Sequence, residues 1–241
     1  MQYQLYYWPS IQGRGEFVRL ALEEAGADYV DVARHSGRGM GVKAMEKFLD
    51  DEKLATAPYA PPFLKAGTLV IAQTANILFY LGRRHGLAPR SEAGRMWVNQ
   101  LQLTVGDLVT EIHDTHHPIG SSLYYRQQKP EAHRRAKNFR TERLPKFLGY
   151  FEQVLSGGKG RRRYMAGNMC SYADLSMFQL VAGLRFAFPK AMKKQEPDYP
   201  GLVDLHDRIA ARPNIAAYLA SERRIPFNEY GIFRYYPELD G

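Results

Sequence analysis

The first 85 residues switch between strand-like and helix-like patterns. Tyr3, Leu5 and Tyr7 fall on every second position, which predicts a strand with one apolar face. After a turn that ends near Gly13, the apolar residues follow the helical spacing of three and four, with Gly26 as the C-terminal stop; they are Val18, Ala21, Leu22 and Ala25. Residues 27–32 then predict a second strand.

Two short apolar runs further on predict a hairpin. Residues 63–64 and 68–71 are separated by Lys65, Ala66 and Gly67, and a three-residue connection that contains glycine is typical of a hairpin turn. A helix from Thr74 to about residue 82 follows. The order is therefore strand, helix, strand, loop, strand, strand, helix, which predicts a thioredoxin-like α/β domain over residues 1–82.

Beyond Glu92 the strand signals nearly vanish and helical stripes replace them. The stripes consist of Trp97, Leu101, Val105, Leu108 and Ile112; of Leu144, Phe147, Leu148, Phe151 and Leu155; and of Leu202, Leu205 and Ile209. Such stripes predict an all-helical bundle over residues 92–241. Residues 83–91 contain Gly86 and Pro89 and are expected to form the linker.

Composition excludes several classes of protein. With 45% hydrophobic residues the chain can bury a core, and the single cysteine, Cys170, leaves no internal disulfide framework. The N-terminal residues lack a secretory pattern, and no apolar run reaches the roughly 18 residues of a membrane span. The net charge of +8 is spread over separate segments, one of them around Gly157 to Gly160, so neither nucleic acid nor membrane is an expected partner. We expect a cytoplasmic protein.

The sequence carries one combination of residues that points to a ligand. Pro62 stands at the start of the predicted hairpin, where a cis proline is usually a purposeful feature. Eleven residues later, Gln73 and Thr74 open a helix, and a helix start directs backbone N–H groups toward an anion. Later in the chain, Ser171 and Asp174 have the spacing of a capping box and predict a structural helix start.

Four separated signatures resemble the cytosolic glutathione S-transferases, specifically the tyrosine-type group that includes the pi, mu and sigma classes. They are Tyr7-Trp8-Pro9 with Gly13-Arg14, Pro62 with Gln73-Thr74, Ser171-Tyr172-Ala173-Asp174, and Ala211-Arg212-Pro213 followed by Ala217-Tyr218-Leu219. The resemblance covers nearly the whole chain. It implies the glutathione transferase fold, glutathione as a co-substrate and no further cofactor.

The resemblance makes Tyr7 and Arg14 the catalytic residues. A phenol with a pKa near 10 is protonated at pH 7 and can donate a hydrogen bond to the glutathione thiolate, and Arg14 would add electrostatic support. Two neighbours remain alternatives. Ser10 would replace Tyr7 if the chain behaved like the serine-type enzymes, and Tyr6 is expected on the opposite face of the strand.

The resemblance also implies a set of glutathione-binding residues, which are Trp8, Pro61, Pro62, Gln73, Thr74 and Asp107. Gln73 and Thr74 would hold the γ-glutamyl carboxylate. Asp107 would reach the amino group across the interface of a homodimer. Pro61 departs from the family pattern, because the residue before the cis proline normally donates its N–H and Pro61 has none. Lys43 and Lys47 are weak candidates for the glycyl end.

The expected co-substrate is a small hydrophobic electrophile. The residues that could enclose it are Ile11, His113, His117, Tyr124, Phe227 and Tyr230. His113, His116 and His117 also have a helical spacing that could ligate a metal, although a polar helix end explains them equally and no metal is expected. Two alternatives to conjugation stay open: a non-catalytic binding protein on the same fold, and a glutathione-dependent peroxidase or isomerase.

Overall fold

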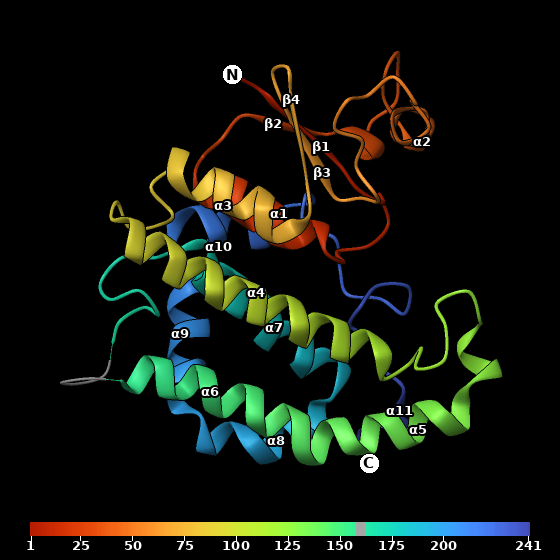
Figure 1. The fold of residues 1–241 in the computed structure, drawn as a ribbon. Coiled ribbons are helices and arrows are strands. Elements are labelled where there is room, and N and C mark those ends of the chain that lie inside the picture. Colours follow the sequence, from red (N-terminus) through yellow and green to blue (C-terminus); the bar gives the residue numbers. More distant parts are fainter. Residues whose placement is uncertain (158–161) are drawn as a thin grey trace.

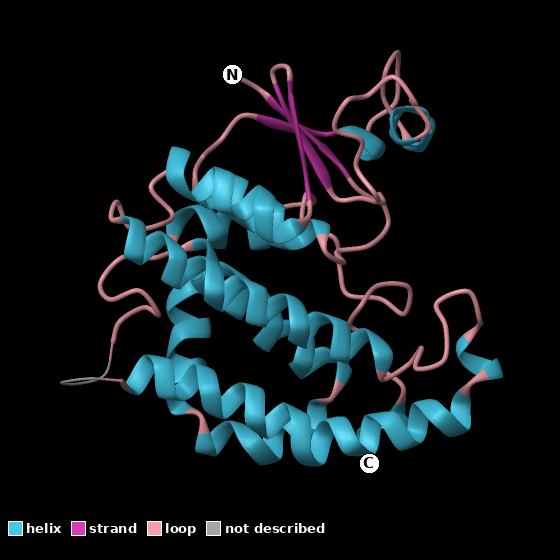
Figure 2. Ribbon diagram, viewed as in Figure 1, coloured by secondary structure: helices cyan, strands magenta, loops and turns pink. Residues whose placement is uncertain are grey.

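The computed structural model describes residues 1–157 and 162–241. Figure 1 shows a layered molecule, with a small sheet at one end and layers of helices beneath it. The strands gather at that end and helices fill the rest (Figure 2). This arrangement confirms the predicted order of a thioredoxin-like α/β part followed by a helical bundle. Most of the charged segment around residues 157–160 lies outside the described residues.

The sheet has four strands in the order β2-β1-β3-β4. β2 is parallel to β1, whereas β3 and β4 are antiparallel to their neighbours. The strands are β1 (Tyr3–Tyr6), β2 (Tyr29–Asp31), β3 (Phe63–Ala66) and β4 (Leu69–Ala72). The period-two pattern explains why both faces are covered: Tyr3 and Leu5 join the large core, while Tyr6 and Phe63 join a second cluster around Met45.

Three α-helices belong to the first part of the chain: α1 (Gly15–Glu24), α2 (Val42–Leu49) and α3 (Thr74–Arg84). In Figure 1, α1 and α3 lie together on the face of the sheet that looks toward the helical bundle, and α2 lies on the other side. Gly26, with a φ of 58°, follows α1 as the expected stop. A short 3₁₀ turn, η1 (Val32–Arg34), follows β2.

Several predicted boundaries were wrong. The hairpin turn is Gly67–Thr68 instead of residues 65–67, because Lys65 pairs with both Gln4 and Val70 and so remains in β3. The second strand covers Tyr29–Asp31 instead of residues 27–32, and α3 runs on to Arg84. The segment predicted as a loop contains α2, whose single fully buried residue is Met45. Eight residues with one inward side chain are too few for a helical period to stand out.

The second part of the chain is helical. Its long helices are α4 (Glu92–Asp114), α5 (Lys129–Asn138), α6 (Leu144–Ser156), α7 (Tyr172–Ala187) and α9 (Pro200–Ala210). The shorter ones are α8 (Pro189–Gln195), α10 (Pro213–Leu219) and α11 (Pro237–Asp240). The remaining turns are η2 (Tyr125–Gln127), the π-type turn η3 (Phe139–Arg143) and η4 (Glu196–Asp198). The predicted stripes are buried in α4, α6 and α9, with Trp97 at the edge, where its indole N–H donates to the Met165 carbonyl.

Helix α7 is the centre of the molecule, because α1, α4 and α9 all pack against it. Its start is held by Asp174, whose carboxylate accepts hydrogen bonds from the backbone N–H groups of Ser171 and Met165, both at 2.8 Å. The Ser171 hydroxyl donates to the same carboxylate at 2.6 Å. The carboxylate thus pairs the N–H of the N-cap residue Ser171, which a helix start otherwise leaves unpaired, and it also ties the segment around Met165 to the start of α7. Across the described ranges, no helix combines the length and the apolar character needed to cross a bilayer.

Candidate active site

A cavity of about 350 Å³ lies where the start of α3 faces the middle of α4. Arg14, Gln73, Thr74 and Asp107, which lie far apart in the sequence, all line it. Its other walls come from Phe17, Ala75, Gln102, Leu103, Val105, Gly106, Val109 and Thr110. The volume falls in the range of small-molecule sites. The structure therefore brings together four of the residues that the sequence singled out.

The start of α3 has two features that suit an anionic ligand. Gln73 has a φ of 68°, which is rare for a residue other than glycine, and it aims the chain into the first turn of the helix. Thr74 Oγ1 is buried and has no hydrogen-bond partner among the described residues. Unpaired N–H groups and the helix dipole add positive potential at the same place. A carboxylate placed there would satisfy both Thr74 and the helix end.

Tyr7 follows β1 and is 5% exposed. Its hydroxyl oxygen accepts a hydrogen bond of 2.8 Å from the backbone N–H of Arg14, whose side chain lines the cavity. The Arg19 guanidinium lies 5.7 Å from the centre of the Tyr7 ring. Burial raises the pKa of Tyr7, and the Arg14 N–H and the two guanidinium charges act against that rise. The phenol is therefore protonated at neutral pH.

Two glycines shape the space around Tyr7. A Cβ on Gly13 would lie 2.1 Å from the Tyr7 hydroxyl oxygen, and Gly13 also has a φ of 45°. A Cβ on Gly15 would lie 2.5 Å from two carbons of the Tyr7 ring. Both distances are too short for any side chain, so glycine is required for this close approach.

Tyr7 is not itself among the cavity walls, and neither are the other residues considered near it. The Tyr6 ring stacks on Phe63 with centroids 4.5 Å apart, and its hydroxyl donates to Gln4. Ser10 is exposed, and its carbonyl accepts from the Asn228 side chain. Trp8 is 40% exposed. A cis peptide bond joins Pro61 to Pro62 directly before β3, and neither proline lines the cavity.

The residues expected around a hydrophobic co-substrate differ in exposure, because His117 is buried whereas Tyr124 and Tyr230 face solvent. Ile11 lies near Gly231, where a Cβ would be 4.0 Å from that of Ile11. Phe227 stacks on Phe186 with centroids 5.1 Å apart and so packs inward. Tyr124 and Tyr230 are 70% and 77% exposed. Phe227 also lines a space of about 10 Å³ between the C-terminal segment and Gly13.

His113, His116 and His117 form a cluster at the end of α4, with ring centroids between 4.7 and 5.6 Å apart. His116 bonds to the Ile232 carbonyl at 2.8 Å. Burial and the nearby Arg234 lower the pKa of His116 to about 2 and that of His117 to about 4, so both are neutral. No group of three or more metal-ligating side chains in the described part of the chain is arranged to hold a metal ion.

Sequence reasoning missed the polar residues that lie behind Tyr7. Glu16 and Arg19 are fully buried on α1, and Gln12 and Gln179 are buried beside them. The available signal was a glutamate and an arginine at i, i+3 on a predicted helix, a pattern that usually marks a solvated face.

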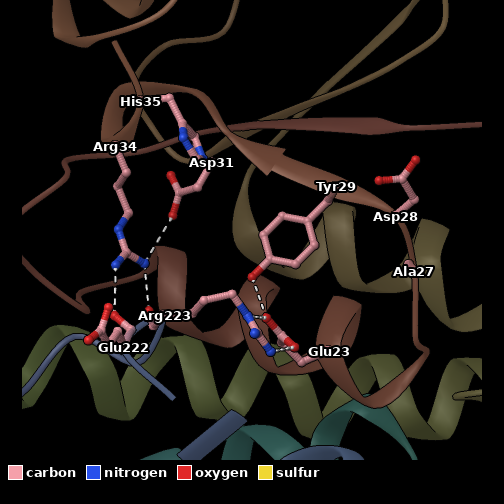
Figure 3. A pocket seen from close by; sticks show the side chains of 9 residues that line it. All are labelled: Glu23, Ala27, Asp28, Tyr29, Asp31, Arg34, His35, Glu222 and Arg223. Atoms are coloured by element: carbon pink, nitrogen blue, oxygen red, sulfur yellow. Dashed lines mark hydrogen bonds and ion pairs between the residues drawn. The ribbon is translucent and has the colours of Figure 1, made fainter.

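A second hollow, of about 430 Å³, opens at the far side of α1 (Figure 3). The charged groups on its walls are mostly paired with one another. Arg223 binds Glu23 at 2.8 Å, the Tyr29 hydroxyl donates to the same carboxylate at 2.8 Å, and Arg34 donates to the Glu222 carbonyl at 3.3 Å. These pairs tie the segment after α10 to the first part of the chain.

The fold and the cavity define a class of protein in which a thioredoxin-like sheet and a helical bundle enclose a site at the start of α3. Residues 113–222 match the family model described as "Glutathione S-transferase, C-terminal domain". A glutathione S-transferase of Plasmodium falciparum is 26% identical over 224 residues, which are 91% of this chain and 95% of that protein. Glutathione S-transferase P 1 of Xenopus laevis is also 26% identical, over 92% of this chain and 93% of that protein. A solved pi-class glutathione S-transferase of Onchocerca volvulus superposes with a TM-score of 0.69 at 23% identity, over 91% of this chain and 92% of that one. Along nearly its whole length the chain is therefore similar to glutathione S-transferases, a family of transferase enzymes, and residues 113–222 match the C-terminal domain of that family.

Proposed function

We propose that this protein conjugates the glutathione thiolate to small hydrophobic electrophiles and that the Tyr7 hydroxyl stabilises the thiolate. One observation carries the proposal: the Tyr7 oxygen accepts a 2.8 Å hydrogen bond from the N–H of Arg14, a residue that lines the cavity together with Gln73 and Thr74. Because this bond uses an acceptor lone pair, the hydroxyl proton stays available for donation to a sulfur atom.

The energy required matches what one hydroxyl can supply. A thiol with a pKa of about 8.5 is mostly protonated at pH 7, and lowering that pKa by about two units takes about 2.7 kcal/mol. A hydrogen bond to a charged group contributes about 1.5–3 kcal/mol. Since burial keeps the pKa of Tyr7 above its ordinary value, Tyr7 acts as a donor and not as a base. The Arg14 guanidinium favours the thiolate further.

The same cavity suggests how glutathione binds. Gln73 and Thr74 would hold the γ-glutamyl carboxylate with the N-terminus of α3, which supplies the partner that buried Thr74 Oγ1 needs. Asp107 would pair with the amino group. In relatives of the tyrosine type this acidic residue comes from the second subunit, and Asp107 is exposed on α4 and so accessible to one. We also place Trp8, Pro61 and Pro62 around the cysteinyl part.

A homodimer follows from this proposal. Leu69 on β4 is 47% exposed, and Met96 and Leu103 on α4 are 49% and 55% exposed, so a second copy would cover apolar surface on both parts of the chain. We also infer that the chain divides into a thioredoxin-like domain over residues 1–82, a linker over 83–91 and a helical domain over 92–241. We infer a cytoplasmic location for the protein. Sedimentation equilibrium should give twice the chain mass of 27.5 kDa. A single-chain mass at micromolar concentration would reject the dimer.

The electrophile would lie against Ile11, His113, His117, Tyr124, Phe227 and Tyr230. Because Tyr124 and Tyr230 are 70% and 77% exposed, part of the electrophile site would be open surface. An open surface constrains the shape of a ligand weakly, so we expect several small electrophiles to react at comparable rates.

The test is conjugation of glutathione to 1-chloro-2,4-dinitrobenzene between about pH 5.5 and about pH 8.5, where a thiol pKa near 6.5 appears in the rate profile. Tyr7→Phe should raise the apparent thiol pKa by about 1–2 units and reduce the rate most at low pH. Tyr6→Phe is the matched control, because its hydroxyl donates to Gln4 away from the cavity. Ser10→Ala tests the serine alternative.

Each outcome of these assays distinguishes the proposed Tyr7 mechanism from one alternative. A Tyr7→Phe profile that overlays the unmodified one, with activity lost in Ser10→Ala, would transfer the role to Ser10. Glutathione binding without conjugation would favour the peroxidase or isomerase alternative, which hydroperoxide and isomerisation assays then decide. A protein that binds no glutathione would be a non-catalytic member of the fold.

A further inference from the structure

A continuous group of buried polar side chains lies behind Tyr7. We call it the Arg19 network, and it consists of Gln12, Glu16, Arg19, Asp31, Gln179, Tyr218 and Arg224. Glu16, Arg19, Gln179 and Tyr218 are fully buried, and the side chain of Arg224 is 11% exposed. Two carboxylates face two guanidinium groups, so the network is electrically balanced. Burial of this many charges is costly unless they are paired and held in place.

Arg19 connects the network to Tyr7 and its loop. Its Nε donates to Asp31 at 2.6 Å, and its Nη1 reaches Glu16 at 3.3 Å. The same Nη1 approaches the carbonyls of Ile11 and Gln12, both at 3.4 Å, while its guanidinium lies 5.7 Å from the Tyr7 ring centre. Arg19 therefore contacts the back of the loop whose front supplies the Arg14 N–H to Tyr7.

The helical part of the chain holds the other end of the network. Gln179 on α7 donates to the Gln12 side chain at 2.7 Å and accepts from Arg224 at 2.9 Å. Arg224 also pairs with Glu16, which accepts from the Tyr218 hydroxyl on α10 at 2.7 Å. The Gln12 amide donates to the Ile225 carbonyl. Every step from α7 and α10 to the loop is thus a direct hydrogen bond or ion pair.

The outer end of the network reaches the hollow in Figure 3. There Asp31 lies 4.0 Å from Arg34, and Arg34 donates to the backbone carbonyls of Glu222 and Arg223. The segment that carries Arg224 is therefore fixed on both sides, by Arg34 outside and by Glu16 inside. A segment held at two places gives the buried end of the network a defined position.

We propose that the Arg19 network positions Tyr7 for the reaction: Gln179 and Tyr218 act through Gln12, Glu16 and Arg19 to hold the loop of residues 11–14 where the Arg14 N–H can donate to the Tyr7 hydroxyl. Gln179 and Tyr218 are positioning residues, because neither lines the cavity. The proposal rests on the proposed function, since it assigns a purpose to the geometry at Tyr7. Buried hydrogen-bond networks transmit such effects because each member has few alternative partners.

Two substitutions remove bonds at the far end and leave Arg19 in place. Gln179→Met keeps the size of the side chain but removes the bonds to Gln12 and Arg224. Tyr218→Phe removes the hydrogen bond to Glu16 and keeps the ring. The matched control is Tyr172→Phe on α7, because the buried Tyr172 hydroxyl has no hydrogen-bond partner within residues 1–157 and 162–241. All three variants remove polar atoms from the interior, but only the first two loosen the loop.

Two measurements test the proposal. The first is the pH profile of kcat/KM for glutathione, and the second is hydrogen exchange of the peptide that covers residues 8–15, which needs no activity. In Gln179→Met and Tyr218→Phe we expect kcat/KM near pH 6 to fall by about two- to thirtyfold and to recover as the pH rises above the free thiol pKa of about 8.5. Exchange of the peptide should be faster in both variants. Tyr172→Phe should overlay the unmodified protein in both measurements.

A purely structural role predicts a different result. If Gln179→Met and Tyr218→Phe lower the melting temperature but leave both the pH profile and the exchange of residues 8–15 unchanged, the proposal is wrong. If the unmodified protein neither binds nor conjugates glutathione, the proposed function fails. The exchange measurement still decides whether the network holds the loop.

Discussion

Replacement of Gly15 by alanine tests whether the position of the Tyr7 ring matters for catalysis. Gly15 is the first residue of α1, and its backbone lies against the ring. An added Cβ would be 2.5 Å from two ring carbons, whereas ordinary contact begins at 3.4 Å, so the ring must retreat by 3.4 − 2.5 = 0.9 Å. A displacement of about 1 Å at a reacting group can cost about a hundredfold in rate.

The same change has a bounded effect on stability. Forcing one methyl group into a packed site typically costs about 1–3 kcal/mol, so Gly15→Ala should remain folded. Gly149→Ala in α6 is the matched control, because the nearest atom to its Cβ would be a Tyr199 ring carbon at 4.0 Å. Alanine is favoured over glycine inside a helix by about 1 kcal/mol, so this control should be slightly more stable than the unmodified protein.

The assay compares kcat/KM for glutathione conjugation with the denaturant midpoint of each variant. We expect Gly15→Ala to lose about a hundredfold in kcat/KM near pH 6.5 with a raised apparent thiol pKa, and Gly149→Ala to retain full activity. If Gly15→Ala is folded and as active as the unmodified protein, the ring position behind the cavity has no part in the chemistry. The Tyr7 assignment would then lose its structural basis.

Three further predictions concern the ligand and the pH. Pro61→Ala restores a backbone N–H beside the proposed cysteinyl site and should tighten glutathione binding by about two- to twelvefold in calorimetry, since one hydrogen bond is worth about 0.5–1.5 kcal/mol; unchanged affinity would show that no ligand group meets residue 61. Thr74→Val removes the buried hydroxyl that has no partner in the described residues, so the melting temperature should stay unchanged or rise. The same substitution should weaken glutathione binding by at least about tenfold. Equal affinity would mean that the γ-glutamyl carboxylate binds elsewhere. Burial holds the pKa of His116 at about 2, far below the 6.5 of an unfolded histidine, so the unfolded state takes up the proton first as the pH falls. Stability should therefore decrease below about pH 6.5, by about 1.4 kcal/mol at pH 5.5 for this histidine, and His116→Asn should flatten that dependence in denaturant titrations; an unchanged slope would contradict a neutral His116.

The sequence predicted helices best where one face of the helix is buried and the other is exposed to solvent. The stripes in α4, α6 and α9 were found for this reason, because each repeats over several turns. The sequence prediction failed at α2, because a single fully buried residue, Met45, gives no helical spacing of apolar residues. It also misplaced the hairpin turn, because the pairing of Lys65 with two neighbouring strands outweighed the turn preference of Gly67.

The cavity could be predicted in part. Gln73 and Thr74 carry a recognisable helix start, whereas the walls that α4 adds, such as Gln102 and Thr110, depend on how two helices meet. The Arg19 network could not be predicted. Residues Gly15 to Leu22 are all buried on α1, because the sheet with α3 covers one side and α7 with α10 cover the other. A sequence shows which face of a helix is apolar but not whether a second layer covers the polar face.

This double burial has a consequence for catalysis. Helix α1 begins with the close glycine, directly after the Arg14 N–H, and it supplies Glu16 and Arg19 to the contact with the helical part. The element that shapes the Tyr7 site is therefore the same element that joins the two parts of the chain. If the Arg19 network positions Tyr7 as we propose, substitutions on α7 or α10 should change the ionisation of the thiol without touching the ligand. Activity should then be more sensitive to this contact between the two parts of the chain than to the exposed residues beside the C-terminal segment.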